Sequence, residues 1–163
     1  MKKNIKNQTG FSMIEVIMVV GILSILFAIS SIALFRSRTV TANSSTTVLL
    51  ISDLQSQQVK AMNGDSEGRS TNDNYGIKIE SDGYTLFHGI AYSPSEPTNY
   101  KIEADQGSQY SSTFPNDTIL FATGSGEIIG FIDGQNSISL THSSTGLSKS
   151  IELNKLGVIV SNN

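Results

Sequence analysis

The residue with the clearest chemical potential is Glu15, a lone acid at the start of an apolar run. It lies in residues 7–16, which read NQTGFSMIEV, and it follows Gly10 and Phe11 closely. A lone carboxylate in hydrocarbon costs several kcal/mol, so it usually has a partner or a function. A buried ion pair contributes little net stability but can fix the register between subunits. Glu15 is therefore the first candidate for a functional side chain.

No other set of residues forms a recognisable site. His88 and His142 are the only histidines, and neither has a nucleophile or a second ligand near it in the sequence. We expect His88 to pack in a sheet or to face solvent. The segments DSE (65–67) and NDN (72–74) place oxygens at calcium-like spacing, although loop solvation explains them better. We predict a protein that is not an enzyme, with no catalytic residues, no metal ligands and no cofactor.

Composition and charge narrow the function classes further. The chain has 163 residues, no cysteine, and a net charge of -3. This length suits one domain plus an appendage, and the absence of cysteine excludes disulfides and thiolate sites. Removing residues 1–10 would take away three lysines and no acid, which changes the net charge from -3 to -6. An acidic body repels phosphate backbones, so we expect no nucleic acid partner.

The apolar run has the length of a membrane span. Residues 16–35 contain no charged side chain. As a helix they would cover about 30 Å, enough to cross the core of a bilayer. Lys2, Lys3 and Lys6 precede the run, which favours a cytoplasmic N-terminus. We expect residues 11–35 to form a single span, with the C-terminal region on the extracytoplasmic side.

The helix is expected to continue as an amphipathic half over residues 36–62, because no proline interrupts residues 11–62. Its spaced apolar residues fall within an arc of about 140°, which predicts one buried face. That face consists of Val40, Val48, Ile51, Leu54, Val59 and Met62, whereas Leu49 and Leu50 lie off it. Gly64 is a suitable cap, and residues 63–74 are expected to be a loop.

From Tyr75 onward the apolar period changes to two, which is typical of strands. Asp82-Gly83 separates two alternating runs and predicts a hairpin. The expected strands lie at 75–80, 84–90, near 100–104, and at 118–122, 127–132, 137–142, 149–153 and 158–160. Residues 63–163 therefore form a mostly antiparallel β-domain. An apolar sheet face needs a cover, so we predict an α+β fold with the second half of the helix packed on the sheet.

The residues from Gly10 to Glu15 and the apolar run behind them resemble the type IV pilin superfamily, which includes the pseudopilins of type II secretion. The family pattern is Gly, then Phe or Met, then typically Thr-Leu-x-Glu, and here Ser12 and Met13 replace Thr and Leu. The resemblance implies that residues 1–10 are a leader. A prepilin peptidase would cut between Gly10 and Phe11 and methylate the new Phe11 amine.

The resemblance also implies a place of action. The mature chain would wait in the inner membrane and then join a pilus or pseudopilus, through an inner-membrane assembly platform and other subunits. Glu15 would approach the Phe11 amine of a neighbouring subunit. The β-rich body, with its expected strand at 127–132 and a closing hairpin over residues 150–160, is most similar to the H-type minor pseudopilins. Position 32 is Ile32 rather than a kinking proline, and there is no cysteine pair, so the chain departs from many major pilins.

Several alternatives stay open at this point. The chain could be a more abundant filament subunit, or a membrane-anchored or secreted β-rich binding domain outside any filament. Ala28-Ile29-Ser30 has the small residues of a signal-peptidase site, which would release a soluble domain after Ser30. The C-terminal residues 150–163 contain one lysine, so the DNA binding of some minor pilins is not expected here. Secretion, motility and DNA uptake are equally compatible with the sequence.

Overall fold

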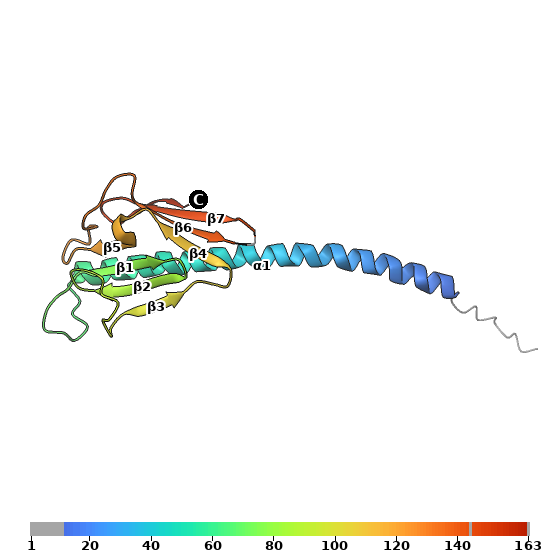
Figure 1. The fold of residues 1–163 in the computed structure, drawn as a ribbon, viewed down its shortest axis with the longest axis horizontal. Helices are drawn as coiled ribbons and strands as arrows, with labels where there is room; N and C mark the ends of the chain where they lie inside the picture. Colours follow the sequence, from blue (N-terminus) through green and yellow to red (C-terminus); the bar gives the residue numbers. More distant parts are fainter. Residues whose placement is uncertain (1–11, 144, 163) are drawn as a thin grey trace, which may run out of the picture. The chain divides into compact units, whose positions relative to one another are not determined.

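The computed structural model describes residues 12–143 and 145–162, and for residues 32–45 it describes the backbone alone. The chain divides into two compact units, with the boundary between Arg38 and Thr39. The long helix α1 (Met13–Asn63) contributes its first part to one unit and its second part to the other. All strands belong to the second unit (Figure 1).

Helix α1 ends where Gly64 permits a left-handed turn. Gly64 has φ +60°, its N–H donates to the Ala61 carbonyl at 3.0 Å, and the Asp65 N–H donates to the Lys60 carbonyl at 2.9 Å. These two bonds are those of a Schellman motif, which satisfies carbonyls at the end of a helix. The predicted cap at Gly64 is confirmed.

One sheet has the strand order β3-β2-β1-β5, and each of its pairings is antiparallel. Its members are β1 (Tyr75–Glu80), β2 (Gly83–His88), β3 (Tyr100–Glu103) and β5 (Thr118–Phe121). Glu80 pairs with Gly83 across a two-residue turn, so the predicted hairpin is confirmed. A short 3-10 turn, η1 (Pro115–Asp117), leads directly into β5.

A second antiparallel sheet has the order β4-β6-β7-β8. Its members are β4 (Ser108–Ser112), β6 (Ser137–His142), β7 (Ser148–Leu153) and β8 (Ile159–Asn162). The two sheets meet where the Tyr110 N–H donates to the Ser81 carbonyl at 3.1 Å. The predicted β-domain thus contains two four-stranded sheets, and the α+β class is confirmed.

A single hydrophobic core joins the second part of α1 to both sheets. Leu50, Leu54 and Ala61 supply the helix side of the core. The sheet side includes Ile77, Tyr84, Ile119 and Phe121 from the first sheet, and Tyr110, Ile138, Leu140, Ile151 and Leu153 from the second. Ile151 and Leu153, in the strand expected at 149–153, are both fully buried.

The face that α1 buries differs from the predicted one. Val48 is 64% exposed, Val59 51% and Met62 49%, and the Val40 side chain lies outside the described residues. Only Leu54 of the predicted face is fully buried, and Ile51 is half-buried. The buried positions are Thr46, Thr47, Leu50, Leu54, Gln57 and Ala61, and from Thr47 onward their spacing alternates between three and four. Leu50, which the prediction placed off the buried face, is therefore part of it. The prediction counted only large apolar residues, whereas the helix approaches the sheets through small and polar side chains as well.

Two strand assignments also need correction. Residues 127–132 do not form a strand, and Ile128 alone among them makes a β-bridge, to Phe121. Gly126 and Gly130 have positive φ on either side of Ile128, so the backbone turns there instead of extending. Strand β4 (Ser108–Ser112) is absent from the strands that the sequence predicts. Its buried positions are Ser108 and Tyr110. Because Ser108 is polar, the strand lacks the alternation of apolar and polar residues by which a half-buried strand is predicted.

Candidate functional site

The start of α1 is organised around Ser12 and Glu15. Ser12 precedes the first helical residue, and its carbonyl accepts hydrogen bonds from the N–H groups of Glu15 (3.0 Å) and Val16 (3.2 Å). The Ser12 N–H donates back to Glu15 Oε2 at 3.2 Å. An acid at the third helical position that bonds the capping residue's N–H is half of a capping box. The negative charge of Glu15 also interacts favourably with the positive end of the helix dipole.

The hydrogen bond between Ser12 and Glu15 was not predicted, although Ser-x-x-Glu before an apolar run is the usual sequence pattern of a capping box. Glu15 is the candidate site residue within the described part of the chain. Gly10 and Phe11 lie outside the described residues. The structure therefore brings Glu15 together with Ser12.

The helix behind Glu15 has the surface of a membrane span. Residues Met13–Ser31 form the one described helix long and apolar enough to cross a bilayer, and none of this stretch is buried inside the protein. Two serines in the stretch satisfy their hydroxyls within the helix. Ser24 Oγ donates to the Val20 carbonyl and Ser31 Oγ to the Phe27 carbonyl, both at 2.8 Å. Such bonds lower the cost of placing a hydroxyl in an apolar medium.

Glu15 is the only ionisable residue between Met13 and Ser31. Residues 5–31 match a family described as the prokaryotic N-terminal methylation motif. The chain carries the signature of pilins and pseudopilins. Comparisons with curated proteins and with solved structures found no match to the chain.

The pilin signature indicates a pilin-like or pseudopilin substrate of a prepilin peptidase, and it implies assembly with other pilin subunits. Proteins of this type are structural, and the matched helix is consistent with membrane anchoring. The alternative signal-peptidase site after Ser30 lies inside both the matched segment and the continuous helix α1.

His88 belongs to a polar network at the end of β2. Its Nδ1 lies 3.1 Å from Asp73 Oδ2 and its Nε2 lies 2.7 Å from Thr98 Oγ1. Arg69 bonds Asp73 at 3.2 Å and Glu67 at 3.1 Å. A hydrogen bond from Lys60 lowers the pKa of Glu67, although partial burial opposes the shift. The acids with calcium-like spacing thus include Glu67 and Asp73, which are paired with cations. No group of three potential metal ligands occurs among the described residues.

A second polar cluster lies between α1 and the sheets, and no sequence pattern predicts it. The Tyr84 hydroxyl donates to Asp53 Oδ2 at 2.6 Å, and the Thr46 hydroxyl donates to Asp105. Burial raises the pKa of Tyr84 well above its usual value, and its bond to Asp53 adds to this shift. Burial likewise raises the pKa of Tyr110, whose hydroxyl has no hydrogen-bond partner in the described chain.

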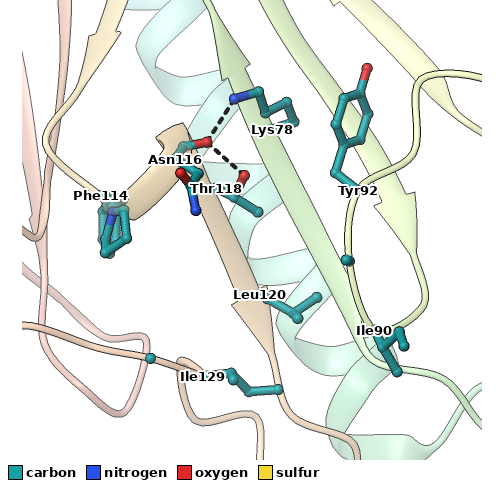
Figure 2. Close-up of a pocket in the computed structure, with 11 residues that line it drawn as sticks. Lys78, Ile90, Tyr92, Phe114, Asn116, Thr118, Leu120 and Ile129 are labelled. Atoms are coloured by element: carbon teal, nitrogen blue, oxygen red, sulfur yellow. Dashed lines mark hydrogen bonds between the residues drawn. The ribbon is translucent and has the colours of Figure 1, made fainter.

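A surface hollow of about 380 Å³ opens on the first sheet (Figure 2). Its lining is mostly apolar, with Ile90 and Tyr92 on one side, Leu120 at the centre, and Ile129 and Phe114 opposite. The one cation in the lining, Lys78, donates to the Asn116 carbonyl at 2.6 Å. The lining residues include no paired nucleophile and base, so the hollow offers no catalytic chemistry.

Proposed function

We propose that this chain is a structural subunit of a type IV pilus or a type II secretion pseudopilus. The observation that carries the proposal is the methylation motif at residues 5–31, which includes an apolar helix, Met13–Ser31, with no residue buried inside the protein. A prepilin peptidase removes residues 1–10 by cutting between Gly10 and Phe11, and the new Phe11 amine is methylated. Gly10 has no side chain, so the backbone before the cut bond can enter a narrow active site.

Glu15 then acts in assembly. In the single chain its carboxylate accepts a hydrogen bond from the Ser12 N–H, which meets only part of its capacity for donors. A carboxylate in hydrocarbon is stabilised further by a cationic partner, and the Phe11 amine of a neighbouring subunit is such a partner. The pair fixes the axial register of neighbouring subunits more than it adds net stability.

Within this class we propose a minor subunit. Ile32 stands where many major pilins have proline, and the chain has no cysteine pair, so both departures favour a minor pilin or pseudopilin. The similarity to the H-type minor pseudopilins rested in part on a strand at 127–132, and that strand is not formed. The closing hairpin is formed by β7 and β8, so this hairpin and the order of elements, a long helix followed by antiparallel sheets, support the H-type assignment.

The subunit starts in the inner membrane and ends in the filament. Three lysines precede the apolar helix, and this supports a cytoplasmic N-terminus with the β-domain on the extracytoplasmic side. Its partners are the prepilin peptidase, the assembly platform in the inner membrane and other subunits. The body carries more acid than base, so nucleic acid is not among the proposed partners.

The test is the mass of the mature N-terminus. The full chain is produced in cells with and without an active prepilin peptidase, and its N-terminal peptide is analysed by mass spectrometry. The proposal requires N-methylated Phe11 in the first strain and an unprocessed chain in the second. A mature chain that begins at Ser31, or one that keeps residues 1–10 in both strains, refutes it.

A further inference from the structure

Three steps along the chain place an asparagine or an aspartate directly before a glycine: Asn63-Gly64, Asp82-Gly83 and Asp133-Gly134. At such a step the glycine nitrogen can attack the side-chain Cγ atom of the residue before it, because glycine has no Cβ atom to hinder the approach. The product is a succinimide ring. Ring closure requires a glycine N–H and an acid or amide side chain that no other group holds, so the structure decides which step can react.

The step at Asn63-Gly64 is held at its nitrogen. The Gly64 N–H already donates to the Ala61 carbonyl at 3.0 Å, in the motif that caps α1. The next N–H, that of Asp65, donates to the Lys60 carbonyl at 2.9 Å, so both residues after Asn63 are bonded to the last turn of the helix. Attack on the Asn63 side chain would therefore have to break this cap first.

The step at Asp82-Gly83 is held at its side chain and at its backbone. Lys101 Nζ lies 2.7 Å from Asp82 Oδ2, and this hydrogen bond lowers the pKa of the Asp82 carboxyl. Ring closure expels a carboxyl oxygen as water, so it needs the protonated carboxyl that Lys101 disfavours. The Asp82 carbonyl also accepts the Ala104 N–H at 2.8 Å, and Gly83 is paired with Glu80 in the hairpin. Both reacting groups are thus restrained.

The step at Asp133-Gly134 has neither restraint. Asp133 and Gly134 are the two central residues of a turn that is closed by a 3.1 Å hydrogen bond from the Gln135 N–H to the Ile132 carbonyl. Gly134 has φ +79°, a conformation that glycine adopts readily. In the described part of the chain, the Gly134 N–H makes no hydrogen bond and the Asp133 carboxyl makes no hydrogen bond or ion pair. Both residues are exposed to water.

The ends of this turn are fixed, although its tip is free. Phe131 packs against the hydrophobic core on one side. On the other side Asn136 is buried, its side-chain amide donates to the Leu153 carbonyl at 2.7 Å, and its own carbonyl accepts the Leu153 N–H at 3.0 Å. Residues 132–135 between these anchors are all exposed. A change in the backbone of the tip can therefore be accommodated without disturbing the core.

We propose that Asp133-Gly134 is a site of spontaneous isoaspartate formation in the folded subunit. The Gly134 nitrogen bonds to Asp133 Cγ, and this carbon loses its hydroxyl group, which leaves as water with the proton of the Gly134 N–H. Water then adds to the main-chain carbonyl carbon of Asp133, and the bond from that carbon to the Gly134 nitrogen breaks. The main chain afterwards runs through Cβ and Cγ, and the former main-chain carbonyl is a free carboxylate. One water leaves and one enters, so the mass is unchanged.

Peptide mapping tests the proposal on the purified full chain in detergent, incubated for weeks at neutral pH. Electron-transfer fragmentation distinguishes isoaspartate from aspartate in each peptide, and a protein L-isoaspartyl methyltransferase measures the total. We expect isoaspartate to accumulate several-fold faster at position 133 than at position 82. The two rates should approach each other in a parallel incubation with denaturant, because the two dipeptides are the same. Equal rates in the folded chain overturn the proposal, as does an undiminished difference in denaturant.

Two variants control for the chemistry of the side chain. Asp133→Asn gives the chain two Asn-Gly steps that both expel ammonia, and we expect deamidation at position 133 to be several-fold faster than at Asn63. Asp133→Glu keeps the charge but requires a larger ring, so it should abolish the reaction at this turn and leave the rate at Asp82 unchanged. Deamidation in Asp133→Asn that is no faster at position 133 than at Asn63 refutes the proposal. Methyl acceptance by Asp133→Glu at the level of the parent chain also refutes it.

Discussion

The Ser12 N–H donates to Glu15 Oε2 at 3.2 Å, across the first turn of the helix that would enter the membrane. The acid therefore has a structural role inside its own subunit as well as the proposed role between subunits. It fixes the point at which α1 begins, two residues after the proposed cut. The two roles use the same carboxylate but not the same property, because capping needs an acceptor and pairing with an amine needs a charge.

Glu15→Gln and Glu15→Ala should separate those roles. Glutamine keeps the acceptor that a capping box uses, whereas alanine loses it along with the charge. Loss of the charge at the helix start costs about 0.3–1 kcal/mol, which α1 tolerates. We expect both variants to be cleaved at Gly10-Phe11 and both to be depleted from filaments, as measured by immunoblotting of sheared filaments. Normal incorporation of Glu15→Gln would show that the charge is not needed for assembly.

Substitutions on the two faces of α1 should differ sharply in stability. Leu50→Ala or Leu54→Ala removes a fully buried side chain and should lower the free energy of unfolding by about 2–5 kcal/mol. Val48→Ala and Val59→Ala change exposed positions and should lie within about 0.5 kcal/mol of the parent. Denaturant unfolding of the full chain in detergent measures both pairs. Equal losses on the two faces would contradict the observed packing.

The two buried tyrosines should respond in opposite ways to loss of the hydroxyl. Tyr84→Phe breaks the 2.6 Å bond to Asp53 and should destabilise the fold by about 1.5–3 kcal/mol, the range for bonds to charged groups. Tyr110→Phe removes a hydroxyl that has no partner among the described residues and should be neutral or stabilising. Thermal melting of the two variants beside the parent decides this. A large loss in Tyr110→Phe would reveal a partner for its hydroxyl.

The same tyrosines predict a loss of stability in alkali. Burial raises the pKa of both phenols above the ordinary value of 10.0, so the folded state holds these protons more tightly than the unfolded state does. The stabilisation is complete below pH 10 and is lost as the pH rises toward the folded-state pKa values. The free energy of unfolding should therefore fall above about pH 10. The double variant Tyr84→Phe/Tyr110→Phe should show a shallower fall, and an unchanged slope would contradict this origin.

Gly76 in β1 should tolerate no side chain, because the neighbouring strands close over it. A Cβ atom built there would lie 2.6 Å from the Ile119 carbonyl oxygen and 2.6 Å from Phe87 Cζ. Gly76→Ala should cost about 1–3 kcal/mol through this overpacking. Gly21→Ala is the control, because a Cβ atom there meets no atom within 4 Å. Gly68→Ala is unsuitable as a control, because Gly68 has φ +83°, a conformation that alanine rarely adopts. Gly21→Ala should therefore leave the stability of the β-domain unchanged.

The sequence predicted the fold class well because its strongest signals are long and regular. The uncharged run 16–35 and the alternation in β1 and β2 each extend over several residues, and these segments form the predicted helix and strands. The buried face of α1 was predicted wrongly because Gln57 and Ala61 carry no apolar signal, and tertiary contacts alone place them inside. Strand β4 escaped notice for the same reason, since Ser108 occupies an inward position.

Of the candidate sites, one could be predicted from the sequence and one could not. Glu15 could be singled out because a charge in an apolar run is visible from one residue. The hollow of Figure 2 could not be predicted, because its lining comes from β1, η1, β5 and the segments at 90–92 and 129–130 together. A site assembled from distant segments depends on the register of the strands in the sheet, and that register cannot be read from a single sequence.

The shared core has a mechanical consequence. Leu50, Leu54 and Ala61 of α1 contact one core that also holds residues of both sheets. A load applied along the helix would shear this entire core at once, whereas a load across a single hairpin would unzip it pair by pair. The chain has no cysteine, so no disulfide shares that load. Tensile strength in this subunit therefore rests on the packed core and on the hydrogen bonds that join α1 to the β-domain.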